Sequence, residues 1–112
     1  MNAGCYGRET KDVLVEAKRL LVEKGHTKGM FARDAQGYMV HATSEKAVCY
    51  CAFGALRAGA SRLVGESACN EWIMKAVDAL EAQGAKRLIK FNDSHTTEDV
   101  LALFDKTIAA TP

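Results

Sequence analysis

The residue types best suited to chemistry in this sequence are four cysteines and three histidines. Cys49 and Cys51 lie in a segment with helical periodicity, whereas the histidines lie outside the predicted helices, at His26, His41 and His95. A cysteine nucleophile needs a histidine within hydrogen-bonding reach, and reactive cysteines favour the N-terminus of a helix over its apolar interior. We therefore expect Cys49 and Cys51 to pack in the core rather than to catalyse a reaction.

A zinc site or a cofactor site would need residue spacings that the sequence lacks. On a helix, Cys49 and Cys51 would point away from each other, and there is no Cys-x-x-Cys or His-x-x-x-His pair. Cys5 and Cys69 add no separation that suggests a disulfide. Phosphate-binding glycine loops and a Gly-x-Ser-x-Gly motif are also missing. We expect no metal and no cofactor, and we assign no catalytic residue.

A cluster of polar residues at 92–95 has two interpretations. Asn92, Asp93 and His95 could form a polar site in a loop, which would make the protein a small enzyme. Asn and Asp more often accept backbone N–H groups in tight turns, so a structural turn that leads into the next helix is the favoured interpretation.

A basic cluster precedes this turn. Lys86, Arg87 and Lys90 lie beside Phe91 and could contact nucleic acid phosphates. The chain as a whole has fifteen Lys and Arg residues against fourteen Asp and Glu residues, so it lacks the long-range field of a typical nucleic-acid-binding protein. A solvated basic face is favoured, and nucleic acid binding remains the less favoured alternative.

Apolar residues spaced three and four apart predict two helices in the first half of the chain. The first runs from Thr10 to Lys24, and the second begins with Ser44 as its cap and ends at Gly59. Within the second helix, residues 49–56 are apolar over a wide arc, so we expect them at the centre of the fold. Gly54 suggests a close crossing by another helix.

The same spacing predicts two further helices in the second half. The third follows Gly65 and ends at Gly84, and residues 85–91 read as an extended connector. The last helix follows Thr96, which with Asp99 resembles a capping box.

The segment 26–43 separates the first two predicted helices. Its short mixed runs at 30–33 and 38–41 flank a type I turn at 34–37, which predicts either a small hairpin or a loop. If the segment is exposed, its large apolar side chains could form a protein-binding patch: Met30, Phe31, Tyr38 and Met39.

The predicted elements define an all-α fold, or an α fold with a minor β-hairpin. We expect one compact four-helix domain over residues 1–112, with a hairpin-like insertion between the first two helices and a loosely ordered terminus at 1–9. A membrane-spanning apolar run and the apolar core of a signal peptide are both missing, so we expect a cytoplasmic location.

Three motifs resemble those of a family of small, functionally uncharacterised proteins from bacteria and their phages. They are Cys51-Ala52-Phe53-Gly54-Ala55-Leu56, Phe91-Asn92-Asp93 and the segment 98–106, and the resemblance covers about residues 10–110. It carries no activity, but it directs attention to Cys51, Gly54, Asn92 and Asp93. It also favours an accessory factor of a phage or mobile element.

From these observations we expect a small cytosolic interaction protein that binds a macromolecular partner. A protein is the favoured partner, nucleic acid is less favoured, and a membrane is not expected. The alternatives are a small enzyme with a site near Asn92 and Asp93, and a nucleic-acid-binding module built on the basic cluster.

Overall fold

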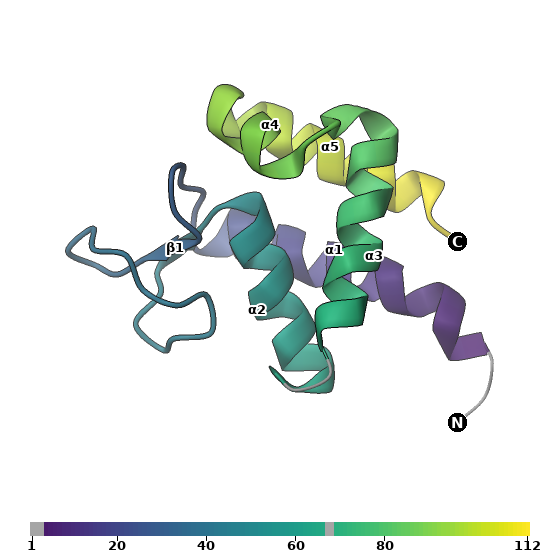
Figure 1. Cartoon of the computed structure of the whole chain (residues 1–112), viewed down its shortest axis with the longest axis horizontal. Helices are drawn as coiled ribbons and strands as arrows, with labels where there is room; N and C mark the ends of the chain where they lie inside the picture. Colours follow the sequence, from purple (N-terminus) through teal and green to yellow (C-terminus); the bar gives the residue numbers. More distant parts are fainter. Residues whose placement is uncertain (1–3, 67–68) are drawn as a thin grey trace.

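Five α-helices and one short antiparallel strand pair make up the part of the chain that the structure describes, residues 4–66 and 69–112 of a computed structural model. Helices α2 and α3 lie side by side and cross α1, while α4 and α5 cover one end of this arrangement (Figure 1). The elements follow in the order α1 (Gly4–Glu23), β1 (Ala32–Arg33), β2 (Cys49–Tyr50), α2 (Ala52–Val64), α3 (Cys69–Leu80), the π-helical turn η2 (Glu81–Ala85), α4 (Leu88–Ser94) and α5 (Thr97–Ala110).

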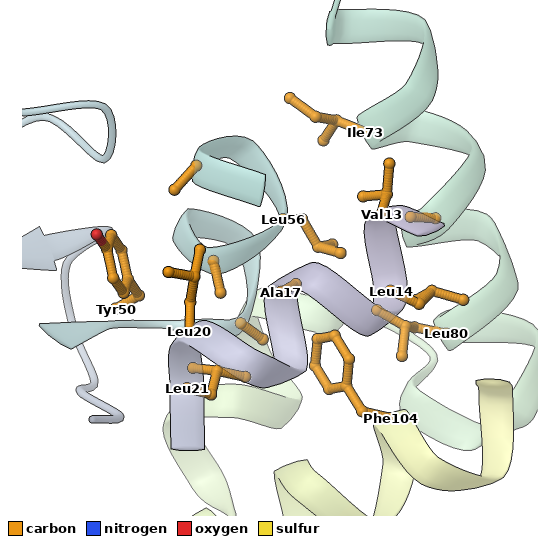
Figure 2. Close-up of a cluster of buried hydrophobic side chains, with 14 of the residues drawn as sticks. Val13, Leu14, Ala17, Leu20, Leu21, Tyr50, Leu56, Ile73, Leu80 and Phe104 are labelled. Carbon is orange, nitrogen blue, oxygen red and sulfur yellow. The ribbon is translucent and has the colours of Figure 1, made fainter. Parts of the chain in front are cut away.

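Helix α1 passes through the middle of the molecule. Val13, Leu14, Ala17 and Leu20 lie at spacings of three and four and are fully buried. Their side chains meet α2, α3 and α5 on different sides (Figure 2), whereas we expected the second helix at the centre. The helix also begins at Gly4 rather than at Thr10, so it includes residues 4–9, which we expected to precede it.

Helix α2 begins at Ala52, and the prediction that it starts at Ser44 is wrong. Residues 45–46 form a turn, and residues 48, 50 and 51 have N–H groups that bond to distant segments instead of continuing a helix. The N–H of Val48 donates to Arg33 O at 2.8 Å, and that of Cys51 donates to Phe31 O at 3.0 Å. These bonds replace the ones that a longer helix would form within itself.

Two glycines permit close backbone contacts of α2. A Cβ atom on Gly54 would lie 2.0 Å from the carbonyl oxygen of Phe31, so the close neighbour is a loop backbone and not the helix that we expected. Gly59, predicted to end α2, instead lies within it, where a Cβ atom would be 3.2 Å from the Ala17 nitrogen of α1. The helix ends at Val64 and is followed by Gly65, whose positive φ of 84° is a conformation that glycine adopts without strain.

A small antiparallel strand pair lies between α1 and α2, where the sequence predicts a hairpin-like insertion. Strand β1 pairs with β2, in the register Ala32 with Tyr50 and Arg33 with Cys49. The run 38–41 contributes only an isolated bridge from Met39 to Arg33, next to a turn closed by Gly37 N–H and Asp34 O at 3.0 Å. A small antiparallel strand pair in this insertion is therefore confirmed, but β1 pairs with residues 49–50 and not with the run 38–41 that flanks the predicted turn.

The second half contains one helix more than predicted. Helix α3 and the capping box of α5 agree with the sequence, and Asp99 N–H donates to Thr96 Oγ1 at 3.1 Å. The predicted connector at 85–91 and turn at 92–95 are wrong, because Leu88–Ser94 forms α4. Leu88 and Asn92, four residues apart, are the buried face of this short helix.

Candidate functional site

The side chain of Asn92 joins three segments that are far apart in the sequence. It is 1% exposed, and its Oδ1 accepts hydrogen bonds from the Ala52 N–H at 2.8 Å and from His26 Nε2 at 2.6 Å. Its Nδ2 donates to Thr27 O at 3.1 Å and to Asp93 Oδ1 at 3.0 Å. The backbone partners fix the orientation of the amide, because an N–H can only donate and a carbonyl can only accept.

The orientation of Asn92 also fixes the tautomer of His26. Since Asn92 Oδ1 accepts from His26 Nε2, the ring carries a hydrogen on Nε2. In the neutral ring, Nδ1 then accepts from the hydroxyl of Thr97, 2.9 Å away at the start of α5. The network therefore connects the loop after α1 with the beginning of α2 through Asn92 of α4, and with the beginning of α5 through His26.

Asp93 supports the same loop from the exposed side of α4. Its Oδ1 accepts from Asn92 and from the Gly29 N–H at 3.1 Å, and these hydrogen bonds hold the pKa of the carboxyl below its ordinary value. A carboxyl with a lowered pKa stays ionised at neutral pH and is poorly suited to general acid or base catalysis.

His95 does not join this network. Its ring stacks on Phe91, with the two ring centroids 3.8 Å apart, and its Nδ1 lies 3.0 Å from the Phe91 carbonyl oxygen. The histidine that meets Asn92 is His26, which lies 66 residues earlier in the chain.

Cys51 lies at the position that reactive cysteines favour, the N-cap of a helix, because α2 begins later than predicted. Its Sγ accepts a hydrogen bond from the Gly54 N–H at 3.3 Å, and burial raises the pKa of the thiol. A buried neutral thiol is a packing group rather than a nucleophile. Among the side chains that the structure describes, those of residues 10–66 and 69–112, no three His, Cys, Asp or Glu groups are arranged to hold a metal ion.

A surface cavity of about 550 Å³ lies where α4 faces α2 and α3. Its apolar lining includes Leu88, which is buried, and Ile89, which is 50% exposed. Two cations of the predicted basic cluster, Arg87 and Lys90, also line it, and so do the carboxylates of Glu81 and Asp93. We call the following residues the α4 surface: Phe53, Val77, Arg87, Leu88, Ile89 and Lys90.

A second cavity of about 370 Å³ lies on the other side of the same cations. Arg87 and Lys90 line both cavities, and Lys86 and His95 line the second. Lys86 is held in a γ-turn with φ of 58° and ψ of −63°, in which Arg87 N–H donates to Ala85 O at 2.6 Å. This turn is rare and strained for a residue with a side chain.

The predicted apolar patch is divided. The ring of Phe31 lies 5.3 Å from that of Phe53 and so adjoins the α4 surface, while Met30 is half-buried. Tyr38 and Met39 are strongly exposed beside the turn at 34–37, and they do not line the α4 cavity.

These features define a small, mainly helical protein with a two-stranded hairpin and an amphipathic cavity beside a short helix. The chain belongs to the DUF6197 family, a family of unknown function whose profile matches residues 6–110. The resemblance to an uncharacterised family is thereby confirmed. No match was found among curated proteins or among solved structures. In the described part of the chain, no helix has the length and apolarity needed to cross a membrane.

Sequence reasoning missed the apolar part of the α4 surface. The sequence predicts Phe53 in the core and an extended connector at 85–91, so it does not indicate Leu88 and Ile89 as binding residues. The available signal was the pair Leu88-Ile89 between Arg87 and Lys90, which places bulky apolar side chains among cations.

Proposed function

We propose that this protein acts by binding another protein through the α4 surface. The observation that carries the proposal is an apolar cavity of about 550 Å³ with Arg87 and Lys90 in its lining. Concave sites with a mainly apolar lining and a few polar groups are typical of ligand-binding sites, and at protein interfaces such pockets receive anchor side chains of the partner. Phe31, 45% exposed, extends the apolar area beyond the cavity through its contact with Phe53.

The enzyme alternative is less well supported by the same geometry. Asn92 uses both of its acceptor and both of its donor positions within the fold and is buried from a substrate. Asp93 lines the cavity, but its carboxyl is engaged by Gly29 and Asn92. Both residues are better explained as supports of α4.

We further propose a cytoplasmic setting, in which the partner is a host protein and this chain is an accessory factor of a phage or mobile element. Cys49, Cys51 and Cys69 are free thiols, which suits a reducing compartment. The resemblance to proteins of bacteria and their phages favours such a factor.

The test compares the proteins that the wild type and two variants capture from a host lysate. Ile89→Asp places a carboxylate on the apolar lining and is expected to lower partner affinity on the order of tenfold or more. Val15→Asp is the matched control, because Val15 is 48% exposed on α1 and lies outside the cavity lining.

The proposal predicts at least one protein that the wild type and Val15→Asp retain and Ile89→Asp loses. Equal recovery of every captured protein by all three forms would contradict binding through the α4 surface, as would the capture of none.

A further inference from the structure

The charged side chains around the α4 cavity differ in whether they form hydrogen bonds or salt bridges within the protein. Glu81 Oε2 accepts from the Leu88 N–H at 2.9 Å, and Asp93 Oδ1 accepts from Gly29 and Asn92. Within the described residues, no salt bridge involves Arg87 or Lys90. The two carboxylates of the lining keep their charge but are held in place by donors of the fold, whereas Arg87 and Lys90 are exposed and free to turn toward a ligand.

The position of the cations defines where a ligand charge would lie. Arg87 and Lys90 line both the apolar cavity and the second cavity, so they stand between the two. Lys86 adds a third cation to the second cavity. A ligand with an apolar group in the first cavity would therefore carry negative charge directly beside that group.

We infer that the α4 surface accepts a linear acidic segment of a partner protein, with a bulky apolar side chain in the cavity and Asp or Glu residues against Arg87 and Lys90. This inference rests on the proposed protein-binding function and adds the chemistry of the partner. An apolar anchor in a pocket flanked by charge pairs is a common arrangement at protein interfaces.

The same surface suits nucleic acid less well. The apolar lining formed by Leu88, Ile89 and Val77 offers no partner for a phosphate. One face of the Phe91 ring is covered by His95, so that face is not available for stacking on a base. The formal net charge of +1 gives little long-range attraction for a polyanion.

The test selects binders from a display library of random linear peptides, using the whole protein as bait. The expected peptides combine Leu, Ile, Phe or Trp with neighbouring Asp or Glu residues. Arg87→Glu/Lys90→Glu should weaken the selected peptides about tenfold, because each reversed charge replaces attraction with repulsion. Lys24→Glu/Lys46→Glu makes the same change in net charge outside the α4 cavity and should leave affinity unchanged.

A charge-exchanged peptide separates specific pairing from a loss of folding. Replacing the acidic residues of a selected peptide by Lys should abolish binding to the wild type and restore it to Arg87→Glu/Lys90→Glu. Restored binding also shows that this variant is folded.

Other results would overturn the inference, and they differ from failure of the proposed function. Selected peptides that lack acidic residues, or whose affinity is unchanged by the double reversal, would contradict the acidic partner while leaving protein binding intact. An empty selection would also contradict it, and the lysate comparison would then decide the proposed function independently. Salt-dependent binding of a single-stranded oligonucleotide, lost on double reversal and without any selected peptide, would assign the surface to nucleic acid.

Discussion

Asn92 has a side-chain amide with two acceptor and two donor positions, and all four are occupied. A buried amide without partners would destabilise the fold, and these four hydrogen bonds compensate for the loss of water around the Asn92 side chain. One residue of α4 thus holds the loop after α1 and the first turn of α2 in place.

Asn92→Ala is expected to destabilise the protein by about 3 kcal/mol, because it leaves the Ala52 N–H, the Thr27 carbonyl and His26 without their partner. Urea unfolding measures this change. Asn70→Ala, at an exposed position on α3, is the matched control and should change stability by about 0.5 kcal/mol or less. Equal effects of the two substitutions would show that the amide network does not support the fold.

The lowered pKa of Asp93 means that the stability of the folded protein should depend on pH. Its folded pKa lies below its ordinary value of 3.8, so its contribution is complete above about pH 4 and is lost as the pH falls through the folded pKa. Asp93→Asn should therefore cost about 1 kcal/mol or less at neutral pH, because the side chain is exposed, and the cost should shrink at acid pH. Thermal unfolding from neutral to acid pH measures the difference, and a constant cost across this range would contradict the expected role of the carboxylate.

Helix α4 shows why a short element is difficult to predict from sequence. Its seven residues are too few for helical periodicity to be recognised, and no side chain within it or just before it caps its start. The cap comes from Glu81, whose carboxylate accepts a hydrogen bond from the Leu88 N–H. On the buried face of the helix, Asn92 accepts a hydrogen bond from the distant Ala52 N–H. Neither contact can be read from the local sequence.

The start of α2 was mispredicted for a related reason. Ser44 is a residue type that caps helices well, whereas Cys51 is not, so local preference pointed to the wrong position. Backbone hydrogen bonds from Val48 and Cys51 to the segment 31–33 keep these residues extended, so the helix begins only after Cys51. By contrast, the capping box at Thr96 and Asp99 is purely local, and the sequence predicted it correctly.

The γ-turn before α4 leads to a prediction about strain. Lys86→Gly should stabilise the protein by about 0.5–1 kcal/mol, because glycine adopts the positive φ without strain, although it gains entropy in the unfolded chain. Lys86→Ala removes the same charge but keeps the strain, and it should give no stabilisation. Chemical unfolding compares the two variants, and a glycine variant less stable than the alanine variant would contradict stored strain at this turn.

At the scale of the whole molecule, the core and the candidate binding surface adjoin each other, and Val77 and Leu88 belong to both. The core forms where α1, α2, α3 and α5 bury stripes that repeat every three or four residues, and this pattern made most of it predictable (Figure 2). The α4 surface combines residues from α2, α3 and α4, which come together only in the folded chain (Figure 1). The sequence therefore identified the cations but not the apolar cavity beside them.

Hydrogen exchange of the protein, alone and bound to the partner captured in the lysate comparison, tests the central claim that the α4 surface is the binding face. We predict slower exchange on binding in residues 86–94 and in the neighbouring parts of α2 and α3 that line the cavity. Slower exchange confined to residues 34–41, or to the exposed face of α1, would contradict this claim.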